Sequence, residues 1–304
     1  MFSPSRRCIP AKDASLFWAK CDRILGKCAS GVVAVPEVKS AKRVADLLQI
    51  IAQHPPGLTF SELLAASDLP KSSLHSLLTT LVAEQMLRYE PISRQYGLGG
   101  RLFEMAAAYS RQLQIVPAAW PFMLAIRDEL DETVQLAVLD GPMVVYVAKV
   151  ESSYPLQLAS SVGSRLPAYA TGIGKALLAT LPEAQLAALY AEPLTQFTDR
   201  TPASLGDLAE RLRQAKAEGY AVDWGEYSAD VCCVAVPVIG SEHTGVAALS
   251  VSVPASRFDD GRRTNAVQCL RRLSASLSLQ LGASQPDAWR DGDELSVPES
   301  RVGG

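Results

Sequence analysis

The stretch DLPKSSLHSLLTTLVAEQM, residues 68–86, combines an apolar stripe with a face of small polar side chains. At about 100° per residue, a helix over these residues separates the two sets. The apolar side consists of Leu74, Leu77, Leu78, Leu81 and Val82, and the opposite side of Ser72, His75, Ser76, Thr79 and Ala83. Exposed helix faces usually carry charged side chains, whereas these short ones let the helix approach another surface closely. The helix alone leaves both interpretations open, a solvated face and a contact surface.

Two further helices are predicted before this stretch. The segment SAKRVADLLQIIAQHPPG has apolar residues at helical spacing and ends in Pro-Pro-Gly at residues 55–57, which predicts a helix that stops before them. Thr59 and Glu62 then have the spacing of a capping box, which predicts the start of a second, short helix. A tight turn at residues 68–70 connects that helix to the quoted one.

Two short strands are predicted after the quoted helix, at residues 87–89 and 95–98, with turn-forming residues between them. Three helices followed by a hairpin is the order of elements in a winged helix-turn-helix domain. In that fold the last helix enters the major groove of DNA and the hairpin lies along the backbone. The sequence therefore predicts such a domain over residues 40–98.

Residues 40–98 resemble the DNA-binding domain of the IclR family of bacterial transcription regulators. LPKSSLHSLLTTL is similar to the family's recognition helix and RYEPISRQYGLG to its wing. Two later stretches, RLPAYATGIGKALLA and GYAVDWGEYSADVCCVAVPV, resemble motifs of its effector domain, so the resemblance spans residues 40–282 in one order. Together with the polar helix face and the basic residues beside it, the resemblance implies DNA contacts by Lys71, Ser72, Ser73, His75, Ser76, Thr79, Arg88 and Arg94.

The charge of this domain is balanced. Residues 40–98 contain five basic and five acidic side chains, a net charge of zero, although a basic patch usually accompanies nucleic-acid binding. Residues 1–39 contain seven basic and three acidic side chains, a net charge of +4. We therefore expect modest non-specific affinity for DNA. We interpret residues 1–39 as a disordered basic extension, with a basic arm on the DNA as the alternative.

The chain has 304 residues, of which 48% are hydrophobic, and this length suits two domains. No apolar run approaches the roughly 20 residues of a membrane-spanning helix, and no secretory signal is recognisable. We expect a cytoplasmic protein without a membrane partner. The predicted order is the extension 1–39, the winged helix-turn-helix domain 40–98, a linker and dimerisation helix 99–116, an effector-binding domain 117–282 and a tail 283–304.

The linker helix has an apolar stripe at helical spacing that extends to Pro117 and contains Leu102, Met105, Tyr109 and Leu113. This stripe packs either onto its own chain or onto a second copy. The resemblance favours the second copy, which gives a dimer or a dimer of dimers. Two recognition helices would then lie on two half-sites of a double-stranded DNA operator.

The rest of the chain alternates hairpins and helices. Strand pairs are predicted at residues 133–150, around Asp-Gly-Pro at 140–142, and at residues 232–254, around a turn at 241–245. Helices are predicted over residues 204–219, ended by Gly219, and over 260–281. This pattern predicts an α+β domain on an antiparallel sheet, and the resemblance implies that it is GAF-like.

The stretch YATGIGKALL, residues 169–178, departs from the phosphate-binding P-loop pattern. We interpret Thr171, Gly172 and Ile173 as a helix start after a loop at residues 164–170, where unpaired N–H groups bind anions. A glycine-containing helix start without a ligand is the alternative. Ser250 and Ser252 share one face of a strand, so they add two hydroxyls if that face points inward.

The resemblance also assigns ligand contacts and apolar walls in the effector domain. These residues are Gly172, Ile173, Asp223, Cys233, Ser250 and Ser252, with Leu158 and Val231 as walls. Tyr169 stands where the family usually has His, and we expect its ring to stack on a ligand or to cap it. Asp230 stands where the family usually has Gly and adds a negative charge near the site. The predicted effector is a small organic acid, aromatic acids included.

The predicted function is a ligand-responsive, DNA-binding transcription regulator that controls a catabolic operon, and not an enzyme. Two alternatives stay open: a thiol-dependent small-molecule enzyme, and a partner-binding protein whose helix-turn-helix domains no longer read DNA. The six cysteines include no CxxC pair, and the three histidines are scattered. We therefore expect no structural disulfide, no metal site and no cofactor.

Overall fold

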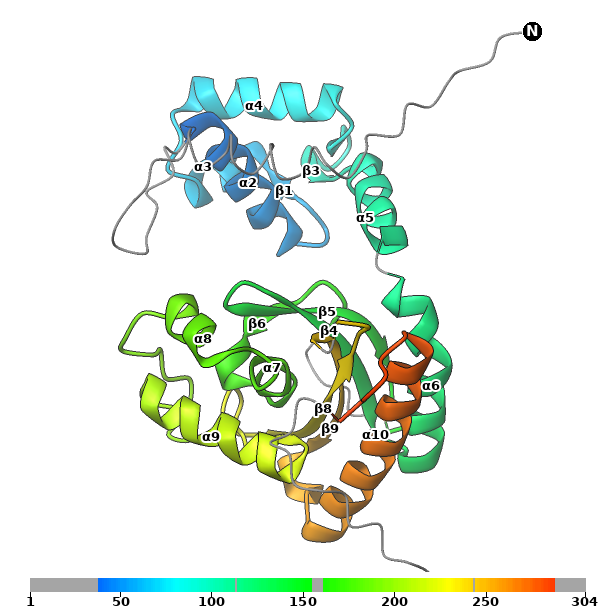
Figure 1. The fold of residues 1–304 in the computed structure, drawn as a ribbon. Coiled ribbons are helices and arrows are strands. Elements are labelled where there is room, and N and C mark those ends of the chain that lie inside the picture. The colour runs from blue at the N-terminus through cyan, green and yellow to red at the C-terminus, as the bar shows by residue number, and fades with distance from the viewer. Residues whose placement is uncertain (1–37, 113, 155–160, 243, 288–304) are drawn as a thin grey trace, which may run out of the picture. The chain divides into compact units, whose positions relative to one another are not determined.

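The computed structural model describes residues 38–112, 114–154, 161–242 and 244–287, with the backbone alone at residues 109–112. The chain forms two compact units that divide between Tyr109 and Ser110 (Figure 1). Several predictions fall outside the described residues: the extension as far as residue 37, the side chains of Tyr109, Leu113 and Leu158, and the tail from residue 288.

From residue 38 on, the first unit contains three helices, a three-stranded sheet and most of a fourth helix, which leads into the second unit. Its elements are α2 (Lys39–Ala52), β1 (Leu58–Thr59), α3 (Phe60–Ala66), α4 (Lys71–Ala83), β2 (Leu87–Glu90) and β3 (Gln95–Leu98), followed by α5 (Gly100–Gln112). Strands β2 and β3 form the antiparallel wing, and β1 adds to β3. The predicted winged helix-turn-helix order is confirmed, with β1 as an addition that two residues were too few to indicate.

The core of this unit consists of the apolar stripes of the three helices and the start of the wing. Its buried residues are Leu47, Ile51, Leu63, Leu74, Leu78, Leu81 and Leu87. The predicted capping box at the start of α3 is confirmed. Thr59 N–H donates to Glu62 Oε2 over 2.7 Å, and Glu62 N–H donates to Thr59 Oγ1 over 3.4 Å.

The second unit is built on a six-stranded sheet in which every neighbouring pair is antiparallel. Its strands are β4 (Thr133–Asp140), β5 (Met143–Val150), β6 (Arg165–Pro167), β7 (Ala221–Asp223), β8 (Val231–Ile239) and β9 (Gly245–Pro254). They lie in the order β6-β5-β4-β9-β8-β7. The α+β architecture predicted from the two hairpins is therefore confirmed.

Helices cover both faces of this sheet (Figure 1). The helices α6 (Ile115–Leu130) and α10 (Asp260–Gln280) pack on one face, and α7 (Gly172–Leu178) and α9 (Leu205–Glu218) lie on the other. The short α8 (Glu183–Leu189) packs on the edge of the α7 side. Because side chains alternate along a strand, the central strands supply a separate apolar core to each face. As predicted, α9 ends at Gly219, whose φ of 77° suits glycine.

Two local features differ from the prediction. The apolar periodicity predicts a helix that continues to Pro117, but α5 ends at Gln112 and α6 begins at Ile115. Pro117 lies in the first turn of α6, where proline is tolerated because those N–H groups have no helical acceptor. Secondly, the predicted loop at residues 164–170 contains β6 and a 3-10 turn, η2 (Ala168–Ala170), both too short to have a recognisable period.

No helix within the described ranges is both long enough and apolar enough to cross a membrane.

Candidate DNA-binding face and effector cavity

The polar side of α4 lies on the surface of the first unit. Lys71, Ser72, His75, Ser76 and Thr79 are exposed, whereas Ser73 is half-buried. The opposite side of the helix is buried in the core. The helix thus presents most of the predicted DNA contacts on one accessible face.

Two hydroxyls on this face are already engaged with the helix backbone. Ser76 Oγ donates to the Ser72 carbonyl over 3.0 Å, and Thr79 Oγ1 donates to the His75 carbonyl over 2.9 Å. A hydroxyl that has donated its proton still offers lone pairs. Ser76 and Thr79 therefore present acceptors outward, and donors to a base have to come from Ser72, His75 or Lys71.

The wing carries the two predicted arginines. Arg88 on β2 lies opposite Gly97 on β3, and a Cβ at Gly97 would approach Arg88 Nε to 3.1 Å. Gly97 therefore leaves room for the Arg88 side chain along the wing. Arg94 lies in the turn with a positive φ of 55°, and both arginines are exposed. Ile92, in the same turn, is 95% exposed. An apolar side chain at the tip of the wing is visible in the sequence, but it was not among the predicted DNA contacts.

A cavity of about 240 Å³ lies in the second unit, between the sheet and the start of α7. Seven of the nine predicted ligand residues line it: Gly172, Ile173, Asp223, Val231, Cys233, Ser250 and Ser252. The rest of the lining consists of Thr171, from the predicted helix start, and six residues that were not predicted: Gln135, Tyr146, Ser164, Leu166, Tyr227 and Ser228. The cavity thus brings together residues from all six strands of the sheet, β4 to β9.

Strand register explains how such distant residues meet. Asp223 on β7 lies opposite Cys233 on β8, which lies opposite Ser252 on β9. Ser252 Oγ donates to Gln135 Oε1 over 3.0 Å and lies 3.0 Å from Cys233 Sγ. Ser250 and Ser252 are 1% and 2% exposed, so their strand face points inward. The cavity therefore contains the two buried hydroxyls that were expected if this strand face pointed inward.

The start of α7 closes one side of the cavity. Thr171 caps this helix, because its Oγ1 accepts a hydrogen bond from Gly174 N–H over 3.1 Å. A Cβ on Gly172 would approach Asp223 N to 3.2 Å and Cys233 Cβ to 3.4 Å. Glycine at residue 172 therefore permits the close packing of α7 against β7 and β8. The N–H groups of Gly172 and Ile173 begin the helix and have no helical acceptor.

Asp223 is the only acidic residue among the described residues that line the cavity, and it is 4% exposed. Its Oδ1 accepts hydrogen bonds from the N–H groups of Gly225 and Glu226, over 2.9 and 2.6 Å. Burial, and then the charge of Glu226, raise the pKa of Asp223 to about 7, against the opposing effect of those hydrogen bonds and of Lys175. No described residue of the lining is a Lys, Arg or His, so a negative charge here meets no basic side chain.

The thiol in the cavity is not activated. Burial, and then the charge of Asp223, raise the pKa of Cys233 well above its ordinary value. A nucleophilic cysteine needs the opposite shift. Cys232, Cys233 and Cys269 are free thiols, and no group of His, Cys, Asp and Glu in the described part of the chain is arranged to hold a metal ion.

Two residues that the sequence analysis discussed for this site, Tyr169 and Asp230, are not part of the cavity lining. Tyr169 does not line the cavity: its hydroxyl donates to the Thr195 carbonyl over 2.8 Å, and its ring packs edge-on against Tyr190 at 5.3 Å. Both the hydroxyl and the ring of Tyr169 are thus engaged with residues outside the cavity lining. Asp230 is exposed and also lies outside the cavity lining. Leu158 lies outside the described residues.

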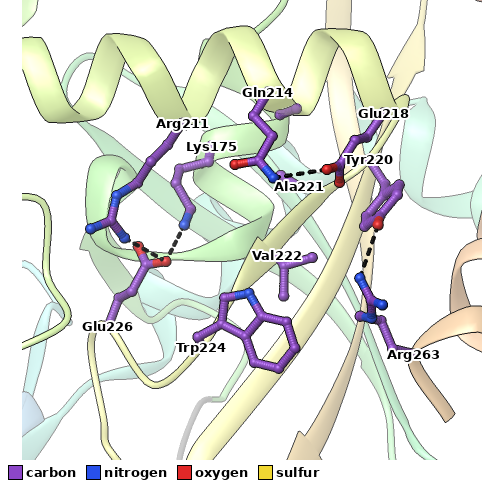
Figure 2. A pocket seen from close by; sticks show the side chains of 11 residues that line it. Lys175, Arg211, Gln214, Glu218, Tyr220, Ala221, Val222, Trp224, Glu226 and Arg263 are labelled. Carbon is purple, nitrogen blue, oxygen red and sulfur yellow. Dashed lines mark hydrogen bonds and ion pairs between the residues drawn. The ribbon is translucent and has the colours of Figure 1, made fainter. Parts of the chain in front are cut away.

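A second cavity, of about 270 Å³, lies between α9 and the edge strand β7 (Figure 2). Its charged side chains are paired with one another. Glu226, 1% exposed, accepts a hydrogen bond from Lys175 and forms an ion pair with Arg211 over 3.1 Å. Arg211 also pairs with Asp207 over 3.0 Å, and Arg263 with Asp260 over 3.1 Å. Each basic residue of this cavity thus has an acidic partner, and nothing in the sequence indicated this buried network.

Two family models match the chain. One, described as the bacterial transcriptional regulator IclR C-terminal domain, matches residues 107–279, and the other, the IclR helix-turn-helix domain, matches residues 40–91. Among curated proteins, the HTH-type transcriptional regulator XynR of Escherichia coli is 35% identical over 249 residues, 82% of this chain and 99% of that protein. The transcriptional repressor IclR of the same organism is 28% identical over 252 residues, 82% of this chain and 92% of its own length.

Solved structures give the same result. The IclR protein of Thermotoga maritima has a TM-score of 0.68 and 26% identity, and the alignment covers 81% of this chain and all of that one. An IclR homologue from Microbacterium hydrocarbonoxydans, crystallised in complex with 4-hydroxybenzoate, has a TM-score of 0.69 and 26% identity, with 80% of this chain and 98% of that one covered.

Proposed function

The chain belongs to the IclR family of bacterial transcription regulators, and we propose that it controls a catabolic operon in response to a small organic acid. The single observation that carries the effector part is the cavity beside α7, where buried hydroxyls lie together with the first residues of a helix. The protein acts in the cytoplasm, where its DNA operator lies.

The DNA-binding part of the proposal uses the exposed face of α4 and the wing. Lys71, Arg88 and Arg94 contact phosphates, because their long cationic side chains stand at the start of α4 and along the wing. The shorter side chains of Ser72, His75 and Thr79 face base edges in the major groove.

Two copies of the chain pair through α5 and so present two recognition helices. Phe103 and Met105 on this helix are 78% and 50% exposed within one chain, which is apolar surface that pairing would bury. The effector acts by binding one arrangement of the paired chains better than the other.

The proposed effector is a carboxylic acid, aromatic acids included. Its carboxylate lies at the N–H groups of Gly172 and Ile173, within reach of Ser250 and Ser252. The homologue crystallised with 4-hydroxybenzoate supports an aromatic acid as a ligand of this fold. The cavity walls supplied by Ile173, Leu166 and Val231 suit an apolar body.

The proposal contains no catalytic step. A thiol enzyme would need Cys233 as a thiolate, and burial opposes that form. The alternative function, in which the helix-turn-helix domains bind a partner protein instead of DNA, has its own test. A gel shift on the DNA upstream of the gene would then show no complex.

Calorimetry tests the effector proposal. Benzoate, 4-hydroxybenzoate and short aliphatic carboxylates should bind better than their amides. Replacing both Ser250 and Ser252 with alanine should weaken acid binding by about 1–3 kcal/mol, because two buried hydrogen-bonding groups are lost. The matched control is the pair Ser274→Ala and Ser278→Ala, two equally buried serines on α10 across the sheet, which should leave affinity unchanged. Equal binding of acids and amides by the wild type would contradict the proposal.

A further inference from the structure

We propose that Asp223 sets the preference of the effector cavity for acids, because it carries the proton that a bound carboxylate needs beside it. This inference rests on the proposed function, in which a carboxylate enters the cavity. In the bound state the Asp223 carboxyl O–H donates to the effector carboxylate. When Asp223 is ionised beforehand, that proton comes from water, so binding takes up one proton per site.

The position of Asp223 leads to this proposal. Its Oδ1 is held by the N–H groups of Gly225 and Glu226, so Oδ2 is left to meet a molecule in the cavity. The described lining supplies no basic side chain that would neutralise a second carboxylate. Two carboxylates in one buried site cannot both remain ionised at low cost, and they share a proton instead.

The titratable groups around Asp223 come from four elements. They are Lys175 on α7, Tyr146 on β5, Cys232 and Cys233 on β8, and Glu226 and Tyr227 on the segment after β7. Tyr146 and Cys233 stay neutral, because burial raises the pKa of each. Lys175 is the basic group whose charge acts on Asp223, and it is paired with Glu226 outside the cavity lining. The strands β4 and β9 face Asp223 with uncharged Gln135, Ser250 and Ser252.

The protonation of Asp223 therefore decides which ligand fits. The protonated form donates a hydrogen bond and accepts an acid, whereas the ionised form repels an acid and accepts a hydrogen bond from an amide or a hydroxyl. Its pKa of about 7 allows either form near neutrality. Acid affinity should consequently fall as pH rises above 7, by about tenfold per pH unit, whereas amide affinity should not fall.

The experiment measures benzoate and benzamide binding to the full-length protein by calorimetry from pH 6 to 8.5. Each titration is repeated in buffers of different ionisation enthalpy, which gives the number of protons taken up. Wild type should take up close to one proton with benzoate at pH 8 and none with benzamide. Asp223→Asn, which keeps the acceptor for both N–H groups, should bind benzoate independently of pH and without proton uptake. Asp230→Asn, the same change at a nearby exposed residue, should behave as wild type.

The outcomes separate the two proposals. Benzoate binding without proton uptake overturns the role of Asp223 and leaves the effector proposal standing. Failure of every acid of the panel, at every pH, overturns both. Benzoate is the test ligand because it has no hydroxyl group. If benzoate binds with proton uptake and 4-hydroxybenzoate binds without it, the role of Asp223 is supported. Its ionised form would then accept a hydrogen bond from the phenol hydroxyl.

A ligand-free measurement tests the same residue. The pKa of Asp223 is raised in the folded state, so the folded chain holds its proton over a range, from about pH 4 to about 7, in which the unfolded chain releases it. Wild type should therefore lose thermal stability relative to Asp223→Asn as pH rises through this range, and the difference should be constant above it. A difference that does not change between pH 4 and 8 would overturn the inference.

Discussion

The two units of this protein present their binding groups in opposite ways. The polar face of α4 consists of exposed side chains on one helix, separate from the leucines that hold the domain together. The cavity of the second unit is lined by side chains from six strands, and the buried ones among them also belong to the packing of the sheet. Under the proposed function, binding and stability therefore depend on different residues in the first unit and largely on the same residues in the second. Substitutions that separate the two effects test this difference.

The largest expected effect comes from the buried ion pairs next to the cavity. Glu226→Gln leaves the buried ammonium of Lys175 without its anionic partner, and breaking such a pair costs about 3–5 kcal/mol of unfolding free energy. Urea denaturation followed by circular dichroism measures this. The control is Glu210→Gln, whose pair with Arg213 is exposed on both sides and contributes about 0–1 kcal/mol. Equal losses for the two variants would mean that the buried network does not stabilise this unit.

The next effect lies on α4 and compares its two sides directly. Leu78→Ala removes a side chain that is 1% exposed in the core of the first unit and should cost about 2–5 kcal/mol of stability. His75→Ala, one turn away on the exposed side, should change stability by less than about 0.5 kcal/mol while altering base preference. Thermal unfolding and a selected-site binding assay measure the two properties. A stability loss at His75 comparable to that at Leu78 would remove the separation between the two sides.

The difference between the units also decides what the sequence could predict. An amphipathic helix shows both of its faces in a few consecutive residues, so the stripe of α4, the wing and the Thr59–Glu62 capping box followed from spacing alone. The hairpins of the second unit were equally local. The meeting of Asp223, Cys233 and Ser252 depends on the register of three strands, which no local pattern specifies, so these residues came from the family resemblance.

Other features could be predicted neither from local spacing nor from the family resemblance. The pairing of Glu226 with Lys175 joins residues 51 positions apart. Each residue lies in a stretch that resembles the family's effector domain, but no spacing within either stretch indicates that the two side chains meet. Tyr169 was expected at the ligand because it stands where the family usually has His, but its hydroxyl bonds to the carbonyl of Thr195 and its ring packs on Tyr190. Tertiary contacts of this kind override an expectation based on neighbouring sequence.

A smaller effect is expected from phosphate contacts at the start of α4. Lys71→Ala should weaken binding to all DNA sequences by roughly tenfold at 0.1 M salt and reduce the slope of log affinity against log salt by about 1 per contact. Ser72→Ala, at the neighbouring residue, should keep the slope and change the preference among bases. Fluorescence anisotropy over a salt series measures both. An unchanged slope in Lys71→Ala would mean that α4 does not begin at a phosphate.

The smallest expected effect comes from two threonines, one in each unit, that both cap the start of a helix. Thr59 caps α3 at the surface, and Thr171 caps α7 in the cavity wall, where it is 4% exposed. Alanine at either residue should cost about 1 kcal/mol of stability, since a side-chain acceptor for a helix N–H is lost. Thr59→Ala should leave acid binding unchanged, because α3 lies in the other unit. Thr171→Ala should also weaken acid binding, because it loosens the turn that orients the N–H groups of Gly172 and Ile173. Serine keeps the hydroxyl, so Thr171→Ser should restore both properties, as calorimetry and thermal unfolding would show. Two results would contradict the difference between the units: loss of acid affinity in Thr59→Ala, or unchanged acid affinity in Thr171→Ala. Either result would mean that the binding residues of the cavity are no more a part of its core than those of α4 are.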